Sequence, residues 1–378
     1  MYNKANSIIE IRHKDHDYQR VFERIQRLSV SLEVEPRSDY RTRIVRNACH
    51  DILNSTGSDS RPRFNLREHV VEDIKQLSDT QLSRYLFYRY RYDVFPQTKQ
   101  LDDFPPCLQI EPTSICNYRC VFCYQTDSEF TLPRNGHMGM MDLDLFKRIV
   151  DQAEGACEAV TLASRGEPFL CRDIKKMLAY MQGKFLALKI NTNAWYLDEQ
   201  KAHTILQSGV NTLVFSADAA SEPLYSQLRV NGKLERILAN IEKFQNIRSR
   251  DYPDSKVITR VSGVRYSADQ NLDEMERLWG NLVDQVAFVD YNPWENTYQR
   301  PVNDVITPCS DLWRRMFVWY DGTVNPCDVD YKSSLAVGNV KQDSLSELWK
   351  GEKYSAYRRA HLTRQRSTVN PCNRCTVT

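Results

Sequence analysis

Residues 108–123 read LQIEPTSICNYRCVFC, an apolar run followed at once by Cys116, Cys120 and Cys123. Three thiolates on one short loop can hold three irons of a [4Fe–4S] cube and leave the fourth iron without a protein ligand. An iron with an open position can bind and activate another molecule. The spacing therefore predicts a catalytic cluster with these three cysteines as its ligands.

A structural zinc site is the alternative for the same cysteines. Such a site is tetrahedral and takes four Cys or His ligands, usually in pairs two to four residues apart. The local set stops at three, and the nearest histidine, His137, lies fourteen residues beyond Cys123. A fourth ligand from elsewhere in the chain would still allow zinc, so the spacing favours a cluster without excluding a zinc site.

Charge and hydropathy restrict the partners. The 378 residues include 51 Lys and Arg against 49 Asp and Glu, a net charge of +2, so we expect no nucleic-acid partner and no anionic membrane surface. No apolar run reaches the ~18 residues of a membrane span, and the first residues lack the apolar segment of a signal peptide. We therefore expect a cytoplasmic protein.

The chain has eleven cysteines, which is many for a cytoplasmic protein, in which disulfides are rare. Three form the loop described above. Four more gather towards the C-terminus, namely Cys309, Cys327, Cys372 and Cys375. The remaining four lie among apolar neighbours, where a free cysteine behaves as a small hydrophobic residue. They are Cys49, Cys107, Cys157 and Cys171.

The hydrophobic pattern divides the chain into three parts. Residues 1–104 are predicted to form a helical N-terminal extension. Its helices are expected over 18–28, 44–53, 70–77 and 78–96. Residues 105–300 alternate between strands and helices, which is typical of βα units around a parallel sheet. Residues 301–378 are predicted to form a small α+β domain with a hairpin over 315–324, turning at Asp-Gly.

Six βα units are expected in the middle part. The predicted strands are 108–112, 159–163, 186–191, 212–216, 256–261 and 285–289, and the helices between them are 142–153, 172–181, 199–208, 233–246 and 272–282. The predicted fold class is therefore α/β, with a partial (β/α)6 TIM-like barrel. Barrel enzymes carry their chemistry on the loops after the strands, and the three cysteines follow the first strand.

Further motifs lie after the next strands. They are 165–168 (RGEP) after the second strand, 191–194 (NTNA) after the third, 216–219 (SADA) after the fourth, and then Leu228-Arg229. Together with the spacing CxxxCxxC and the aromatic Phe122 before its last cysteine, this ordered set resembles the radical S-adenosylmethionine (SAM) enzymes. The resemblance spans about residues 108–290.

The resemblance implies that the three cysteines hold a [4Fe–4S] cluster whose open iron binds SAM. It also implies that the RGEP segment holds the SAM amino group, that Asp218 lies near the ribose and that Arg229 pairs with the carboxylate. The implied SAM contacts are Phe122, Gly166, Glu167, Pro168, Asn193, Ser216, Asp218 and Arg229. Arg165 and Ala194 stand where the family has glycine, so the local loop geometry can differ there.

The four C-terminal cysteines resemble those of the SPASM and twitch domains of this superfamily. A full SPASM domain needs cysteines for two clusters, whereas four cysteines can enclose one, which is the twitch arrangement. The resemblance thus implies a second [4Fe–4S] cluster held by Cys309, Cys327, Cys372 and Cys375. A zinc site with four cysteine ligands is the alternative.

The resemblance implies an oxidoreductase that cleaves SAM to a 5′-deoxyadenosyl radical, which then takes a hydrogen atom from a C–H bond. A closed second cluster favours oxidation of a secondary alcohol to a ketone, with that cluster accepting an electron. The C-terminal pattern most resembles superfamily members that act on sugars and aminocyclitols. We therefore expect a small-molecule substrate, and an electron donor such as flavodoxin or ferredoxin.

Three alternatives remain. An epimerase needs a thiol that returns hydrogen. No cysteine lies between Cys171 and Cys309, but Cys157 and Cys171 could serve. A peptide maturase often binds its leader peptide through a winged-helix segment that includes a small sheet. The first hundred residues of this chain are predicted to be helical throughout, which weakens the maturase hypothesis. The third alternative is a non-enzymatic zinc-binding scaffold, against which the ordered SAM motifs argue.

Candidate substrate contacts lie mainly on the loop after the sixth strand, where a barrel enzyme is expected to bind its substrate. They are Asp290, Tyr291, Asn292, Trp294 and Glu295, together with Arg260 on the fifth strand, which we expect to point into the barrel. Each of them could equally be a structural residue.

Overall fold

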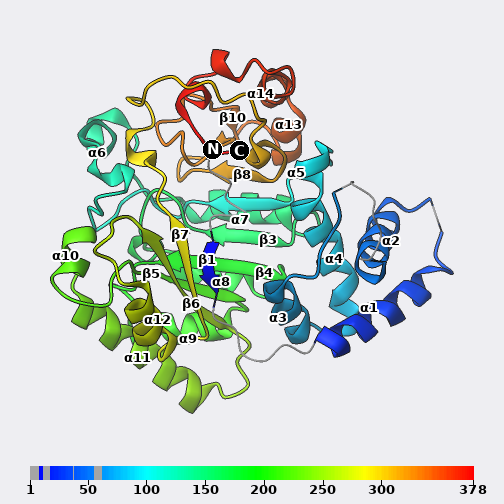
Figure 1. The fold of residues 1–378 in the computed structure, drawn as a ribbon, viewed down its shortest axis with the longest axis horizontal. Coiled ribbons are helices and arrows are strands. Elements are labelled where there is room, and N and C mark those ends of the chain that lie inside the picture. The colour runs from blue at the N-terminus through cyan, green and yellow to red at the C-terminus, as the bar shows by residue number, and fades with distance from the viewer. Residues whose placement is uncertain (1–7, 12–17, 37, 55–61) are drawn as a thin grey trace. The chain divides into compact units, whose positions relative to one another are not determined.

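Six parallel strands lie side by side in the order in which they occur along the chain (Figure 1). The computed structural model describes residues 8–11, 18–36, 38–54 and 62–378. The strands are β2 (Cys107–Ile110), β3 (Ala159–Leu162), β4 (Ala187–Thr192), β5 (Thr212–Ser216), β6 (Ile258–Arg265) and β7 (Gln285–Asp290). Every residue of β2 and β3 is buried, as is typical of parallel strands covered on both faces. The predicted partial (β/α)6 barrel is confirmed.

A helix connects each of these strands to the next. The connecting helices are α7 (Leu143–Ala153), α8 (Ile174–Met181), α9 (Glu199–Gln207), α11 (Leu234–Asp251), which follows the short α10 (Leu224–Leu228), and α12 (Leu272–Gly280). Helix α7 shows why these segments of the sequence form helices. The Asp142 side chain caps it by accepting two backbone N–H bonds, and Leu145, Phe146, Ile149 and Val150 bury one face at helical spacing.

The sheet continues beyond β2 into the C-terminal region. Strand β8 (Arg315–Val318) pairs with β2 in parallel, β9 (Thr323–Asn325) pairs with β8 in antiparallel, and β10 (Gly338–Asn339) pairs with β9. The predicted hairpin over 315–324 is confirmed, and Gly322 takes a φ of +87° at its turn. The C-terminal region is thus continuous with the strand that precedes the cysteine loop.

Strand β1 (Ile8–Ile11) pairs with β7 in antiparallel at the other end of the sheet. The expectation that the first hundred residues are helical throughout is therefore wrong at this strand. Three isoleucines in four residues suit a strand, and the open edge of β7 supplies its partner. The chain divides into two compact units, 13–102 and, with β1 included, 103–378. The boundary at residue 300 stays a prediction.

The described residues of the first unit are helical. Its helices are α1 (Tyr18–Leu32), α2 (Tyr40–Leu53), α3 (Glu68–Gln76), α4 (Asp79–Asp93) and α5 (Phe95–Thr98). A capping box begins α4, in which the Gln81 side chain accepts the Ser78 N–H at 2.9 Å.

Short elements complete the second unit and position its loops. The remaining helices are α6 (Ser128–Thr131), α13 (Leu345–Lys350) and α14 (Glu352–Leu362). Short 3₁₀ turns occur at Tyr124–Thr126, Pro133–Asn135, Pro168–Leu170, Trp294–Asn296, Ser310–Trp313, Arg366–Thr368 and Cys372–Arg374.

Candidate active site

The cysteine loop, residues 115–124, follows β2 at the carboxyl ends of the parallel strands. The backbone N–H groups of Arg119 and Val121 each donate at 3.0 Å to a carbonyl of the segment 228–230. Cys120 is buried, and the other two cysteines are partly buried. Three sulfurs are therefore fixed on one short loop that a second loop supports.

Burial raises the pKa of all three thiols, that of Cys123 to about 12. At neutral pH they stay protonated unless a metal displaces the proton, which a coordinating metal does. The Arg229 Nη1 atom lies 3.7 Å from the Cys120 Sγ atom, so a positive charge is in place to balance a thiolate. This donor set fits an iron–sulfur cluster better than a free nucleophilic cysteine.

Arg229 is itself fixed by Asp218, which follows β5. One carboxylate oxygen of Asp218 accepts the Arg229 Nε–H, and the other accepts the Val264 N–H at 2.6 Å. The guanidinium lies 5.4 Å from the centre of the Phe122 ring. The structure thus brings together Phe122, Asp218 and Arg229, which the sequence predicted as SAM contacts from three separate segments.

Glu167 joins the loop after β3 to the loop after β4. Its buried carboxylate accepts the Thr192 hydroxyl and the Asn193 N–H at 2.7 Å, and the Phe169 N–H at 3.1 Å. The Asn193 side chain donates at 2.9 Å to that of Asn117 in the cysteine loop. Although burial raises the pKa of Glu167, these donors fix its carboxylate next to the cysteine loop.

Gly166 allows the loop after β3 to approach the segment after β2 closely. A Cβ atom on Gly166 would lie 2.3 Å from the Thr113 carbonyl oxygen and 2.6 Å from that of Ile115. The next residue, Glu167, donates its N–H to the Ile115 carbonyl at 2.9 Å. Only glycine fits this contact. Of the other predicted SAM contacts, Pro168 begins the following 3₁₀ turn and Ser216 ends β5.

Ala194 has a backbone conformation that glycine adopts more readily than alanine. Its φ is +60°, in the left-handed region, which costs an alanine about 1–2 kcal/mol. The Thr192 hydroxyl accepts its N–H at 3.0 Å, and Asn240 donates to its carbonyl at 2.8 Å. These bonds hold the loop in the glycine-like conformation despite the substitution.

Three buried polar atoms lie at the ends of neighbouring strands without a hydrogen-bond partner in the described part of the chain. They are Asn117 Nδ2, Ser164 Oγ and Asn191 Oδ1. A buried polar atom without a partner costs about 1–3 kcal/mol, so such atoms are expected to meet a bound molecule. Their places after β2, after β3 and near the end of β4 fit a polar ligand such as SAM beside the cysteine loop.

Two of the predicted substrate contacts lie close to the cysteine loop. The Tyr291 hydroxyl donates to the Glu295 carboxylate. The Tyr291 ring packs edge-on against Tyr266 at 4.8 Å, and the Tyr266 ring lies 5.7 Å from that of Phe122. Sequence reasoning missed Tyr266, although its place directly after β6 was a usable signal.

The other predicted substrate contacts have different surroundings. Asn292 is buried and accepts bonds from Arg300 at 3.3 Å and Thr376 at 3.4 Å. Trp294 packs against the apolar cluster of Val329, Cys375 and Val377. These contacts tie the loop after β7 to the end of the chain, and any substrate role of the two residues stays a prediction.

Arg260 and Asp290 also have partners within the sheet. Arg260 lies in the amino-terminal half of β6 and donates at 2.8 Å to Gln285, the first residue of β7. It is therefore away from the carboxyl ends of the strands, where the cysteine loop lies. Asp290 forms an ion pair with Arg265 at 2.6 Å.

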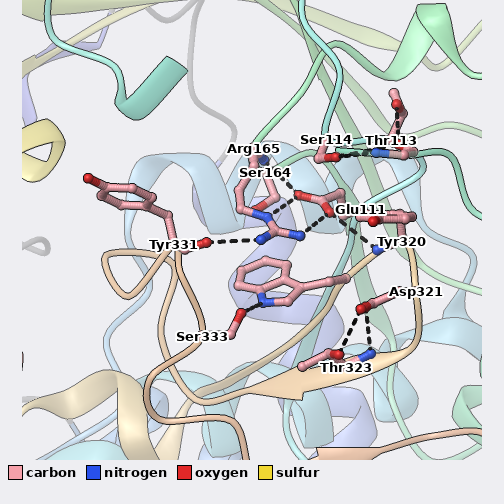
Figure 2. Close-up of polar contacts among 12 residues, drawn as sticks. Glu111, Thr113, Ser114, Ser164, Arg165, Tyr320, Asp321, Thr323, Tyr331 and Ser333 are labelled. Atoms are coloured by element: carbon pink, nitrogen blue, oxygen red, sulfur yellow. Dashed lines mark hydrogen bonds and ion pairs between the residues drawn. The ribbon is translucent and has the colours of Figure 1, made fainter. Parts of the chain in front are cut away.

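The sequence reasoning also missed Glu111, the residue that follows β2. Its buried carboxylate binds the buried Arg165 guanidinium through both oxygens, at 2.6 and 2.7 Å (Figure 2). A charged residue at the end of a buried strand was a signal, because a buried carboxylate needs a partner. The sequence did not show that this partner is Arg165, the residue that replaces a glycine of the family.

The four C-terminal cysteines line one cavity together with mainly apolar side chains. Burial raises the pKa of Cys309 to about 11 and also raises that of Cys372. The buried Arg366 side chain donates to the carbonyls of Cys372 at 3.1 Å and Cys375 at 2.7 Å. Across the part of the chain that the structure describes, no three Cys, His, Asp or Glu side chains are grouped to bind a single metal ion. Four sulfurs around one apolar cavity fit an enclosed cluster.

Two family models match the chain. The model of the radical SAM superfamily matches residues 110–278, and that of the SPASM iron–sulfur cluster-binding domain matches residues 309–376. The tungsten-containing aldehyde ferredoxin oxidoreductase cofactor-modifying protein of Pyrococcus furiosus is 32% identical over 306 residues, which cover 66% of this chain and 82% of that protein. The chain belongs to the radical SAM superfamily. Its radical SAM domain implies SAM and a [4Fe–4S] cluster, and its SPASM domain implies further iron–sulfur clusters.

More distant relatives carry out different reactions. The S-adenosyl-L-methionine-dependent 2-deoxy-scyllo-inosamine dehydrogenase of Niallia circulans is 19% identical over 71% of this chain and 91% of its own. The GTP 3′,8-cyclase of Listeria welshimeri is 22% identical over 64% of this chain. The chain spans 66% of the length of that cyclase.

Solved structures share the fold. Streptococcus suis SuiB, bound to its precursor peptide SuiA, aligns with a TM-score of 0.51 at 15% identity, covering 75% of this chain and 72% of SuiB. In the residues that the structure describes, no helix is both long enough and apolar enough to cross a membrane.

Proposed function

We propose that this enzyme oxidises a secondary alcohol of a small polyhydroxylated molecule, such as an aminocyclitol or a sugar, to a ketone. The cavity with four cysteines is the observation that carries this proposal. Four sulfur ligands complete a [4Fe–4S] cluster and leave no iron open to substrate, so such a cluster is suited to accept an electron. The relationship to the dehydrogenase of Niallia circulans supports the same reaction and substrate class.

The oxidation removes a hydrogen atom from carbon, a proton from oxygen and one electron. When bound, SAM on the first cluster supplies the acceptor of the hydrogen atom, and the second cluster supplies the acceptor of the electron. Cys116, Cys120 and Cys123 would hold the first cluster, and the four C-terminal cysteines would hold the second. Reduced flavodoxin or ferredoxin is the electron donor that we propose.

Glu295 is our candidate for the group that accepts the hydroxyl proton. Its backbone carbonyl oxygen lies 3.2 Å from the Tyr331 hydroxyl, and the Tyr331 ring stacks on Tyr124, the residue after Cys123, at 5.0 Å. The Glu295 carboxylate binds the Tyr291 hydroxyl. A carboxylate beside the cysteine loop can take a proton from substrate directly or through that hydroxyl.

The aromatic row of Phe122, Tyr266 and Tyr291 would form one wall of the substrate site. Its rings follow one another at 5.7 and 4.8 Å from the cysteine loop towards the loop after β7. Such a wall excludes water from the reacting carbon and offers apolar faces to the ring of a cyclitol or sugar.

The test is a reaction of the anaerobically reconstituted enzyme with SAM, dithionite and 2-deoxy-scyllo-inosamine or related polyols deuterated at the carbinol carbons. We expect deuterium in the 5′-deoxyadenosine and a product that has lost both the carbinol deuterium and the hydroxyl hydrogen. Inversion of a carbinol centre without oxidation would contradict the proposal and support the epimerase. A lack of deuterium in the 5′-deoxyadenosine with every polyol would also contradict the proposal.

Replacement of Glu295 tests its role. We expect Glu295→Gln to lower the rate of ketone formation by about 100-fold or more, since general bases contribute that much, while SAM affinity stays within twofold of the wild type. Glu276→Gln, on helix α12, is the control and should retain the wild-type rate. Wild-type ketone formation by Glu295→Gln would exclude Glu295 as the base.

A further inference from the structure

Arg165 sits where the family has glycine, and the structure gives it an extensive set of contacts. Glu111 and Arg165 are 0% and 3% exposed. Besides the two side-chain bonds between them, the backbone N–H of Arg165 donates to the same carboxylate at 3.1 Å (Figure 2). Glu111 therefore holds both the side chain and the backbone at the first position of the SAM-binding segment 165–168.

Both members of this ion pair also reach the C-terminal region. The Arg165 Nη1 atom donates to the Tyr331 carbonyl at 2.9 Å, and the guanidinium lies 4.3 Å from the centre of the Trp319 ring. The Glu111 carboxylate accepts the backbone N–H of Tyr320 at 3.2 Å. One buried ion pair thus connects the end of β2, the loop after β3 and two segments of the C-terminal region.

Tyr331 extends the connection to the cysteine loop. Its ring stacks on that of Tyr124 with 25° between the planes, and its hydroxyl donates to Asp127 at 2.7 Å. The Tyr124 hydroxyl donates to the Ser164 carbonyl at 2.8 Å. Tyr331 comes four residues after Cys327, and Tyr124 directly follows Cys123. The loops that carry ligands of both clusters therefore meet at Arg165.

Ser164, directly before Arg165, has a φ of +143°, a conformation that residues other than glycine rarely adopt. Such a conformation persists only where its surroundings enforce it. Here the Tyr124 hydroxyl binds the Ser164 carbonyl and the Glu111 carboxylate binds the Arg165 N–H, so both ends of the peptide group that follows the strained residue are held. The geometry of the SAM-binding segment therefore depends on contacts that include the C-terminal region.

We propose that Arg165 is a positioning residue that couples SAM binding at segment 165–168 to cluster binding in the C-terminal cavity. A cluster held by Cys327 fixes the segment that leads to Tyr331, and Arg165 transmits that position to Gly166 and Glu167. Coupling between two binding sites is reciprocal, so bound SAM should also strengthen the binding of the cluster in the C-terminal cavity. The inference rests on the proposed ligands of the second cluster and not on the reaction, so it can fail while the proposed oxidation stands.

The test measures SAM affinity by isothermal titration calorimetry in four reconstituted full-length proteins. They are the wild type, Cys372→Ala/Cys375→Ala, Glu111→Gln/Arg165→Met, and the combination of all four substitutions. With Arg165 present, we expect loss of the two cysteines to weaken SAM binding about tenfold, within the usual range of coupling. In the E111Q/R165M background, the same loss should change the affinity less than twofold. The proposal would be overturned if loss of the two cysteines weakened SAM binding equally in both backgrounds, or did not weaken it in the wild-type background.

Two further variants keep the test decisive. Arg248→Met/Asp284→Asn removes another arginine–carboxylate pair, bound at 2.7 Å at the start of β7, and should leave the tenfold coupling intact. Arg165→Lys keeps the charge beside Glu111 but lacks the planar fork that reaches Tyr331, so it should fold and lose most of the coupling. If loss of the two cysteines still weakened SAM binding tenfold in the R165K background, this would count against the proposal even if E111Q/R165M does not fold.

Hydrogen exchange of the cluster-free chain gives a readout that is independent of SAM and of activity. The amides of Arg165 and Tyr320 both donate to Glu111, so E111Q/R165M should exchange faster in peptides that span 164–168 and 319–323. Peptides of α11 should be unchanged. Unchanged exchange in both of the first two peptides would show that the ion pair does not hold these segments.

Discussion

Gly166 shows how a single residue sets the approach of two functional loops. We expect Gly166→Ala to weaken SAM binding at least tenfold, because its Cβ atom would lie 2.3 Å from the Thr113 carbonyl oxygen and would push segment 165–168 away from the cysteine loop. Gly183→Ala is the matched control, since its Cβ atom meets nothing within 4 Å although its φ is +75°. It should cost about 1 kcal/mol of stability and leave SAM binding unchanged. Calorimetric titration with SAM and the melting temperature separate the two effects, and wild-type SAM affinity in G166A would contradict this account.

Sequence motifs predicted Phe122, Asp218 and Arg229 as parts of one site, and the structure brings these three side chains together. Their roles in SAM binding stay predictions. The motifs could not reveal that Glu111 pairs with Arg165, 54 residues away, because that contact depends on how β2 and β3 align in the sheet.

At the scale of elements, the parallel strands were predictable to within a few residues. Buried parallel strands are continuous apolar runs between amphipathic helices, and both patterns are visible in one sequence. The exceptions depend on partner strands: β6 extends to Arg265 because its pairing with β7 continues to Asp290, and β1 forms against the edge of β7.

An ion pair between elements gives a prediction of pH dependence. Burial alone would raise the pKa of Asp284, but hydrogen bonds from Arg248 at 2.7 Å and the Thr259 N–H at 2.8 Å lower it overall. A lowered pKa means that the stabilisation is complete above the unfolded value of about 3.9 and is lost as pH falls through the folded pKa. We expect Asp284→Asn to lower the free energy of unfolding by about 2 kcal/mol at pH 7, and by less at pH 3. Urea unfolding midpoints at the two pH values measure the difference.

Asp173→Asn is the control for this measurement. Its partner Lys176 is largely exposed, so the loss should be below about 1 kcal/mol at either pH. A loss in Asp284→Asn that does not shrink towards pH 3 would show that the carboxylate charge is not what stabilises the junction of α11, β6 and β7.

At the scale of the whole molecule, one sheet connects the cysteine loop with the segment that carries Cys327. Strand β2 leads into the cysteine loop, and its neighbour β8 leads towards Cys327 through the hairpin with β9. The sequence predicted both sets and the hairpin, but not that β8 extends the barrel sheet beside β2, because strand order is a property of long-range pairing. Under the proposed function, the loop after β2 would hold the cluster with an open iron, and the loop after β9, two strands away in the sheet, would supply Cys327 to the enclosed cluster.

The iron content of two reconstituted proteins tests the central claim most directly. The wild type should hold about eight irons per chain, and Cys372→Ala/Cys375→Ala about four, since each [4Fe–4S] cluster holds four. At saturating SAM and with dithionite, the variant should still release 5′-deoxyadenosine, because Cys116, Cys120 and Cys123 remain. Four irons in both proteins, or zinc in place of iron in the C-terminal site, would contradict the account of an open and an enclosed cluster.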